Sequence, residues 1–211
     1  LCSPSRRRAR LEIDATMPSD TDTTVGLVLL NIVMYAFAYQ LQRPVEPFLI
    51  KSLSEGADAK TVAKTYGRLQ SFFQAAQTIG SPIVGALLDK IGARYCSVIV
   101  FLASALSYAI LASSTTLSHL FYSKLAATLQ AGFLVAQAGV AAATATAPPA
   151  VRAAALGRLT TAYTIGATVG PTVGGYRGAT GDLYRGARLA VGVSLLSALL
   201  SLGLPKGTWV R

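Results

Sequence analysis

The feature that most limits the fold of this chain is a set of six stretches, each at least 17 residues long, that contain no Asp, Glu, Lys or Arg. A helix needs about 17–20 predominantly apolar residues to cross the hydrocarbon core of a bilayer. Strands of a transmembrane β-barrel would alternate apolar and polar residues over about ten positions, and these stretches do not alternate. We therefore predict an all-α, polytopic membrane protein with transmembrane helices at about 24–42, 66–88, 95–114, 117–145, 159–176 and 187–205.

The composition supports this prediction. Hydrophobic residues make up 52% of the 211 residues, charged residues make up 13%, and the mean hydropathy is +0.49. A soluble protein of this size would have to bury six helices that are apolar on every side. The net charge of +10 comes from Lys and Arg scattered between the apolar stretches. We therefore expect membrane lipid, including anionic headgroups, as a partner and no nucleic acid.

The two ends of the chain are expected to lie outside the helical bundle formed by residues 24–205. Residues 1–23 form a basic and polar tail, in which Met17 is a candidate start, and a targeting or a non-native segment is one interpretation of this tail. Residues 206–211 form a short tail or the start of a linker. Six spans place both ends on one side of the membrane. The positive-inside rule favours cytoplasmic ends only slightly, because Lys and Arg are nearly balanced between the two sides.

A charged loop within "GALLDKIGARY" separates the second and third predicted helices. Asp89 would end the second helix, where the helix dipole disfavours an unpaired carboxylate, so Lys90 and Arg94 are its expected partners. Gly92 allows a tight turn, and Gly85 allows another helix to approach closely. An ordinary charged turn at the cytoplasmic edge is the alternative interpretation. The spacing resembles the cytoplasmic signature loop of the major facilitator superfamily at Gly85, Asp89, Lys90, Gly92 and Arg94.

A second motif, "GRLTTAYTIGATVGPTVGG", lies in the fifth predicted helix. Gly166, Gly170 and Gly174 recur every four residues and form a smooth strip, which we expect to face a second bundle, as we do for the Asp89 loop. Pro171 removes a backbone hydrogen bond and is expected to kink the helix. A generic packing face explains the glycines nearly as well, but the Gly-Pro pair less well. The set resembles the antiporter motif of the superfamily's drug:proton antiporters: Gly157, Gly166, Gly170, Pro171, Gly174 and Gly175.

The resemblance extends over most of the apolar part of the chain. Residues 66–94 resemble the second helix and following loop of tetracycline efflux proteins and of organic-cation-transporter-like proteins. The "PVEP" at 44–47 resembles the proline pair that closes their first helix, and "SKLAATLQAG" at 123–132 resembles their fourth helix. The resemblance implies the amino-terminal six-helix half of a transporter, in which substrate crosses between two bundles by alternating access. It implies a second six-helix bundle as a partner, supplied by missing carboxy-terminal sequence, by a second copy or by another subunit.

Polar side chains recur at helical spacing along three of the predicted helices. Each is costly against lipid, so we expect them to share a face that lines a central cavity. Interhelical hydrogen bonds, worth about 0.6 kcal/mol each, are the alternative role. Amides and aromatic hydroxyls without a full charge suit a small, amphipathic organic solute. The cavity candidates are Asn31, Tyr35, Tyr39, Gln70, Gln74, Gln77, Gln130 and Gln137.

Four ionisable residues in or beside the predicted helices are candidates for coupling transport to a proton: Arg43, Glu46, Arg68 and Lys124. All four lie near the non-cytoplasmic end, where a long side chain can extend to the membrane interface. Glu46 is the candidate proton carrier, because partial desolvation between two prolines would raise its proton affinity. A nearby Arg43 or Arg68 would lower that affinity again.

Three positions depart from the tetracycline efflux pattern. Tyr35 stands where those proteins have an acidic residue in the first helix, and Ala143 stands where an acidic residue closes their fourth. Lys124 replaces an arginine implicated in proton coupling, and lysine keeps the charge but lacks the planar fork. Proton-coupled efflux is therefore one expectation, and facilitated diffusion or solute exchange would use the same helices.

No enzymatic constellation accompanies these motifs. The chain has a single histidine, which excludes a paired-histidine metal site, and no glycine-rich phosphate loop follows a strand. We expect a protein that is not an enzyme and that has no cofactor and no metal. The competing function belongs to another class: a half-length membrane subunit or degenerate transporter that serves as a structural component of a complex.

Overall fold

The computed structural model of the chain describes residues 19–179 and 181–204. The described residues form helices and their connections and contain no strand, which confirms the all-α prediction for them. Of the expected amino-terminal tail, residues 1–23, the part up to residue 18 lies outside this range and residues 19–23 belong to the first described helix, whereas the expected tail at 206–211 lies outside it. The helices are α2 (Ser19–Leu41), α3 (Glu46–Leu53), α4 (Ala59–Ala112), α5 (Leu117–Ala126), the 3-10 helix η1 (Ala127–Leu129), α6 (Gly132–Ala143), α7 (Pro149–Ala179) and α8 (Arg185–Ser201).

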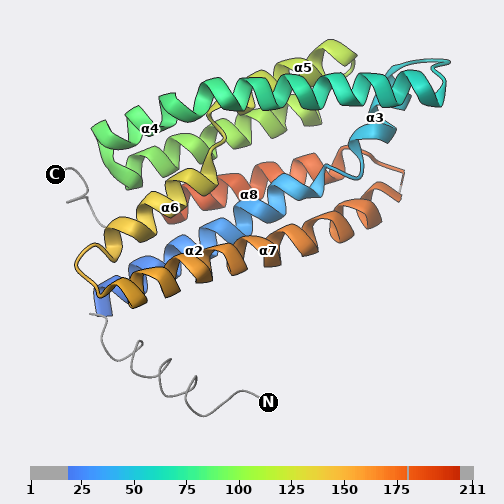
Figure 1. Ribbon diagram of the computed structural model, residues 1–211. Coiled ribbons are helices and arrows are strands. Elements are labelled where there is room, and N and C mark those ends of the chain that lie inside the picture. Colours follow the sequence, from blue (N-terminus) through green and yellow to red (C-terminus); the bar gives the residue numbers. More distant parts are fainter. Residues whose placement is uncertain (1–18, 180, 205–211) are drawn as a thin grey trace.

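The long helices lie side by side in one bundle (Figure 1). Helix α2 packs along α7 and α8, and α4 packs along α8 and α5. The bend in α4 and the α6–α7 connection lie at one end of the bundle, whereas α3 and the α7–α8 connection lie at the other (Figure 1). Successive long segments therefore run up and down, which is the arrangement expected of a membrane helical bundle.

Helix α4 is interrupted by a single non-helical residue. Gly92 has φ 76° and ψ 168°, a backbone conformation that is essentially restricted to glycine. The chain folds back at this residue, so the two segments of α4 lie next to each other (Figure 1). At the other end of the first segment, Asp58 caps the helix by accepting a hydrogen bond of 3.0 Å from the Thr61 backbone N–H. Gly92 thus separates the segments that correspond to the second and third predicted helices.

Two features of the secondary structure differ from the sequence-based expectation. The predicted helix at 117–145 is broken into α5, η1 and α6. The short helix α3 was not expected, because the sequence between the first two predicted helices was taken as a connection. Its first turn holds Glu46 and a proline, which suits an amino-terminal helical position because proline has no backbone N–H to satisfy there.

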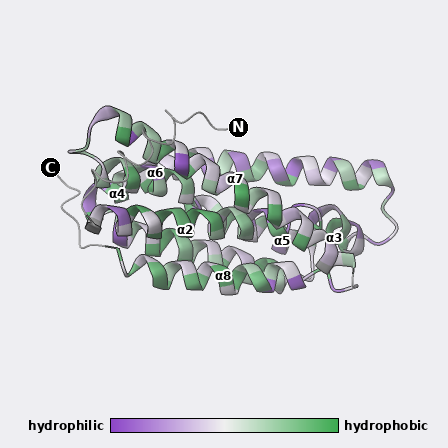
Figure 2. Ribbon diagram, turned by 90° about the horizontal axis from the view of Figure 1, so that it is seen from below, coloured by the Kyte–Doolittle hydropathy of each residue, from purple (hydrophilic) through white to green (hydrophobic). Residues whose placement is uncertain are grey.

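Three helical stretches of the described chain are long and apolar enough to cross a membrane: Thr21–Leu53, Ala59–Ala112 and Leu117–Ala143. Helices α7 and α8, which match the fifth and sixth predicted spans, are not among them. Figure 2 shows that α7 carries many hydrophilic positions, whereas hydrophobic residues dominate α2. Length and composition therefore support fewer spans than the six that the uncharged stretches predicted.

The glycine strip of α7 packs against α2. A Cβ atom placed on Gly166 would lie 2.2 Å from the Val33 carbonyl oxygen, and one on Gly174 would lie 1.8 Å from the Leu41 carbonyl oxygen. The expectation that this strip faces a second bundle is therefore wrong, because its surface is already covered within the chain. Helix α7 is continuous through Pro171.

Candidate functional site

A buried ion pair joins helices α3 and α5. Lys124 and Glu46 contact each other, with only 10% and 4% of their side chains exposed, and Gln70 Nε2 donates to the second carboxylate oxygen of Glu46 at 2.7 Å. Both oxygens of the carboxylate thus have a donor, as a buried charge requires. Glu46 also lies in the first turn of α3, where the helix dipole favours a negative charge. Lys124 and Glu46 therefore do not extend to a membrane interface, as their sequence positions had suggested.

The two arginines among the coupling candidates do not contact Glu46 in the way that Lys124 does. Arg43 is partly buried, donates to the Tyr39 hydroxyl and holds its guanidinium carbon 4.9 Å from the centre of the Tyr39 ring. Arg68 is exposed on α4. In the part of the chain that the structure describes, neither arginine forms an ion pair with Glu46. The cation that directly balances Glu46 is Lys124.

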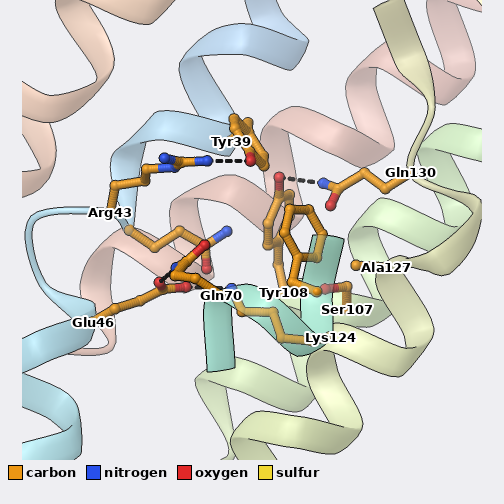
Figure 3. Close-up of a pocket in the computed structure, with 11 residues that line it drawn as sticks. Tyr39, Arg43, Glu46, Gln70, Ser107, Tyr108, Lys124, Ala127 and Gln130 are labelled. Atoms are coloured by element: carbon orange, nitrogen blue, oxygen red, sulfur yellow. Dashed lines mark hydrogen bonds and ion pairs between the residues drawn. The ribbon is translucent and has the colours of Figure 1, made fainter. Parts of the chain in front are cut away.

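The ion pair borders a small polar cavity of about 10 Å³ (Figure 3). This volume is close to the space that one water molecule needs. Above the ion pair, Gln130 Nε2 donates to the hydroxyl of Tyr108, which is buried, and Ser107 lines the same cavity. The cavity is too small for an organic solute, so its side chains form a closed polar network and not a substrate pocket.

A larger hollow of about 290 Å³ lies beside this network and shares Tyr39 and Phe73 with it. Tyr35 and Tyr39 stack with ring centres 6.2 Å apart, and Tyr39 and Phe73 lie 6.0 Å apart. A second aromatic pair, Phe133 and Tyr163, meets edge to face at 5.4 Å. The volume approaches that of small-molecule sites, which are typically about 300–1,000 Å³. The hollow is lined by Tyr35, Tyr39, Phe73, Gln74, Gln77, Phe133, Thr160 and Tyr163.

Side chains from α2 and α4 hold the break between α5 and α6. The Tyr35 hydroxyl donates to the Gln130 carbonyl at 2.8 Å, and Gln77 Nε2 is 3.1 Å from both the Ala127 and the Gln130 carbonyl oxygens. The Gln130 carbonyl, for which no backbone donor is seen among the described residues, is satisfied by these side chains, whereas the Ala127 carbonyl also accepts from the Gln130 backbone N–H at 2.9 Å. The break therefore lies between the hollow and the buried ion pair.

The structure brings most of the predicted cavity residues together, but in two groups. Tyr35, Tyr39, Gln74 and Gln77 line the hollow, whereas Gln70 and Gln130 line the small cavity together with Tyr39. Both groups combine amide side chains with tyrosine hydroxyls. The polar stripes of the first, second and fourth predicted helices thus meet at one place in the bundle.

Two predicted cavity residues lie elsewhere. Asn31 lines a separate cavity of about 20 Å³, and its side-chain nitrogen and oxygen are buried without a hydrogen-bond partner among the described residues. Gln137 is exposed and lines neither the hollow nor the two smaller cavities. Asn31 shares its predicted helix with Tyr35 and Tyr39, and Gln137 shares its predicted helix with Gln130, so spacing alone did not separate them from the residues that line the site.

The sequence reasoning missed the aromatic and small polar residues that complete the two cavities. Aromatic side chains on otherwise Ala-, Gly- and Thr-rich helices were the available signal, because such rings stand out where small residues dominate. The missed residues are Phe73, Ser107, Tyr108, Phe133, Thr160 and Tyr163.

The signature loop does not form the ion pair that its charges had suggested. Asp89 and Lys90 are exposed, and within residues 19–179 and 181–204 Asp89 has no ion-pair partner. Arg94 is partly buried, and its guanidinium carbon lies 5.8 Å from the centre of the Tyr95 ring. A Cβ atom on Gly85 would meet nothing within 4 Å. The surface around Asp89 and Gly85 is therefore open in this chain.

Comparisons with known proteins identify the class to which this bundle belongs. The model of the Major Facilitator Superfamily matches residues 28–207. The chain is 32% identical over 184 residues to mouse solute carrier family 22 member 18, covering 83% of this chain and 43% of the mouse protein. It is 32% identical over 157 residues to the class H tetracycline resistance protein of Pasteurella multocida, covering 74% of this chain and 38% of that protein.

A solved structure agrees with this match. The crystal structure of the human organic anion transporter MFSD10 (TETRAN) superimposes with a TM-score of 0.73 at 21% identity, covering 90% of this chain and 49% of that one. The chain belongs to the Major Facilitator Superfamily and is an integral membrane protein. The resemblance to the drug-efflux members of the superfamily is confirmed, and the chain spans less than half the length of the curated relatives it matches.

Proposed function

We propose that this chain is the amino-terminal half of a transporter that moves a small organic solute across a membrane by alternating access. The observation that carries the proposal is the aromatic hollow of about 290 Å³ beside the buried Glu46–Lys124 pair. Burying two charges inside a membrane bundle costs several kcal/mol before their attraction is counted. A bundle selected only for stability has no need of such a pair next to a solute-sized hollow.

The proposed topology has six spans. Helix α4 contains 54 residues, which at 1.5 Å per residue would extend about 80 Å if straight, whereas a bilayer core is about 30 Å thick. The fold at Gly92 divides it into two spans. The others are α2, the broken helix α5–α6, α7 and α8, and both ends of the chain would lie in the cytoplasm.

A second bundle would complete the path. The curated relatives are more than twice as long as the segment they share with this chain, so they have room for one. The surface available to it includes Gly85, Gly157 and Gly175, where an added Cβ atom would meet nothing within 4 Å. Missing carboxy-terminal sequence, a second copy of the chain or another subunit could supply this bundle.

The proposed solute is a flat organic molecule with an aromatic or otherwise apolar body. The two aromatic pairs of the hollow offer faces and edges for ring contacts, and the amides of Gln74 and Gln77 offer hydrogen bonds that orient the solute. The names of the relatives, an organic anion transporter and a tetracycline resistance protein, agree with a solute of this kind.

The proposal includes coupling of transport to a proton, and this coupling depends on Glu46. It is the one acidic residue among the described side chains that line either cavity. Protonation of its carboxylate would remove the negative charge that holds Lys124, and the two charge states would favour different arrangements of α3 and α5. Because Tyr35 and Ala143 replace two acidic residues of the efflux relatives, Glu46 is the acid that this half can contribute.

Transport assays on the full-length protein that contains this chain test the proposal. In proteoliposomes, tetracycline and the flat organic anion fluorescein serve as probes, and saturable uptake of either is expected. Tyr39→Ala should reduce uptake at least about tenfold, because the ring belongs to both cavities. Tyr122→Ala is the matched control, since Tyr122 is 60% exposed on α5 and lines neither cavity.

A protein that takes up neither probe and purifies as part of a larger complex would instead support the structural-component alternative. The coupling step is tested separately with an imposed pH gradient. Glu46→Gln should abolish gradient-driven accumulation while downhill exchange continues, because the variant cannot bind and release a proton there. Equal loss of both modes in a Glu46→Gln protein that remains folded would contradict the coupling role.

A further inference from the structure

The break between α5 and α6 is not caused by a proline. Residues 127–131 contain no proline, and η1 is followed by Gln130 at φ −77°, ψ 57° and Ala131 at φ −101°, ψ 47°. Helix α6 also begins without a side-chain cap. An interrupted helix in a membrane bundle leaves backbone groups that must find other partners. The conformation of this segment is therefore imposed by what packs against it.

Three hydrogen bonds from other helices impose it. Gln77 Nε2 reaches the Ala127 and Gln130 carbonyls at 3.1 Å each, and the Tyr35 hydroxyl reaches the Gln130 carbonyl at 2.8 Å. Close packing adds to them, since a Cβ atom on Gly80 would lie 1.8 Å from the Thr128 carbonyl oxygen. One amide side chain, that of Gln77, thus bridges two carbonyls of the break.

The residues that meet at the break line the hollow on one side and the cavity beside the ion pair on the other. Gln77 and Tyr35 line the hollow, while the Gln130 side chain lines the small polar cavity. Lys124 lies in the last turn of α5, immediately before the break. A change in the geometry of the break therefore acts directly on the position of the Lys124 ammonium relative to the Glu46 carboxylate.

We infer that Gln77 is a positioning residue that couples the content of the hollow to the Glu46–Lys124 pair through the break at residues 127–131. This inference rests on the proposed function. A solute that hydrogen-bonds the Gln77 amide or the Tyr35 hydroxyl withdraws these donors from the Ala127 and Gln130 carbonyls. The break then repacks and Lys124 moves away from Glu46, whose carboxylate oxygen takes up a proton from hydronium of the surrounding solution, which leaves water.

The chain provides a matched control for Gln77. Gln74 lies one turn earlier on α4, has the same side chain and lines the same hollow. Its side chain is exposed and, among the described residues, makes no hydrogen bond to the break. A solute contact made by either glutamine alters transport when it is removed. Only the loss of Gln77 should alter the break itself.

Hydrogen–deuterium exchange of the purified full-length protein tests this without any solute. Gln77→Met keeps side-chain length but removes the donor, and amide exchange at residues 128–133 should rise about fivefold, the factor expected from one lost net hydrogen bond. Tyr35→Phe, a gentler change that keeps the ring, should raise exchange of the same segment. Gln74→Met should leave it unchanged.

Two further readouts separate positioning from a general loss of stability. In Gln77→Met the exchange of α7 and α8 should match the unsubstituted protein, and the response of residues 128–133 to pH should weaken because the break no longer reports on the ion pair. Equal exchange in Gln77→Met and Gln74→Met would overturn the inference. Because this comparison uses no solute, its failure is distinct from a failure of tetracycline or fluorescein uptake, which concerns the proposed function.

Discussion

Two regions that pack on α2 achieve close contact in opposite ways. Along the seam between α2 and α7, glycines bring backbone against backbone, and the Gly174 position approaches the Leu41 carbonyl too closely for any Cβ atom. At the break between α5 and α6, polar side chains do the same work, with the Tyr35 hydroxyl bonded to the Gln130 carbonyl. The seam relies on a row of close glycine contacts, whereas the break combines one such contact, that of Gly80 with the Thr128 carbonyl, with hydrogen bonds from side chains.

The difference indicates which part of the bundle can change. A glycine seam has no alternative partner for its surfaces, so α2 and α7 can separate only by losing van der Waals contact along their length. Hydrogen-bonding side chains can exchange one partner for another at little net cost. The seam is therefore suited to move as a rigid unit, and the break, with the ion pair beside it, is suited to respond to a solute or a proton.

The largest expected effect on stability comes from removing one partner of the buried ion pair between Glu46 and Lys124. Glu46→Gln leaves the buried Lys124 ammonium without its carboxylate, and the free energy of unfolding should fall by about 3–5 kcal/mol. The double variant with Lys124→Met should recover most of this loss, because it removes both buried charges. Denaturant titration in mixed micelles measures the free energy of unfolding of Glu46→Gln, of Lys124→Met and of the double variant against the unsubstituted protein.

Arg68→Gln is the control for that cycle, since Arg68 is exposed and its loss should change the free energy of unfolding by less than about 0.5 kcal/mol. If Glu46→Gln costs no more than Arg68→Gln, the pair contributes nothing to the fold. A double variant that loses as much as the sum of both single variants would likewise contradict direct coupling between the two charges.

The next effect concerns the seam. Gly174→Ala places a methyl group against the Leu41 carbonyl and should cost about 2–3 kcal/mol of unfolding free energy, because backbone must shift to admit it. The adjacent Gly175→Ala meets open space and should be neutral or stabilising by up to about 1 kcal/mol, since alanine is the better helix former. The midpoints of thermal unfolding of the two variants measure this difference. Equal midpoints would mean that the seam is loosely packed.

The sequence was sufficient for the helical fold and for most of the polar site. Uncharged stretches indicated where apolar helices occur, and helical spacing selected Tyr35, Tyr39, Gln74 and Gln77 for one hollow. Spacing succeeds here because a polar side chain in an apolar bundle is costly unless it finds a shared cavity. The glycines of α7 were likewise recognised as a packing strip, but the partner chosen for them was wrong.

The sequence did not predict which residues of different helices contact each other. Glu46 is the one acidic residue between Asp22 and Glu55, and Lys124 is the one Lys or Arg between Arg94 and Arg152, so opposite isolated charges were the available signal for their contact. The break at residues 127–131 has no proline or glycine within it to announce it. Its cause is the Gln77 and Tyr35 donors, which belong to other helices.

Gly92 differs from the glycines of the seam, because its own backbone conformation requires glycine, whereas the seam glycines are required by the closeness of a neighbouring helix. Its φ of 76° with ψ 168° is unfavourable for any other residue, so Gly92→Ala should lower the free energy of unfolding by about 1–2 kcal/mol. Gly85→Ala, earlier in the same helix and facing open space, should stabilise slightly. Chemical denaturation of both variants checks the expectation. Equal effects would show that the fold in α4 does not depend on Gly92.

The smallest effect is expected at the amino-terminal cap of α4, where the exposed Asp58 accepts a hydrogen bond from the Thr61 backbone N–H. Hydrogen bonds from Thr61 lower the pKa of Asp58 below its usual value of 3.8, so the ionised form is the one that stabilises the folded state. This stabilisation is fully present above the unfolded-state pKa and is lost as pH falls through the lower folded-state pKa. The difference in thermal midpoint between the unsubstituted protein and Asp58→Ala should therefore be constant near neutral pH and shrink below about pH 4.

Glu55→Ala is the matched control for Asp58→Ala, because Glu55 is exposed in the same connection and makes no hydrogen bond that the described residues record. Its thermal midpoint should follow that of the unsubstituted protein across the pH range. If the Asp58→Ala difference persists unchanged at pH 3, the cap acts through its geometry and not through its charge. The cap would then resemble the glycine seam, which also holds helices together without any titratable group. Of these regions, the ion pair of Glu46 and Lys124 would remain as the one that is expected to respond to protons.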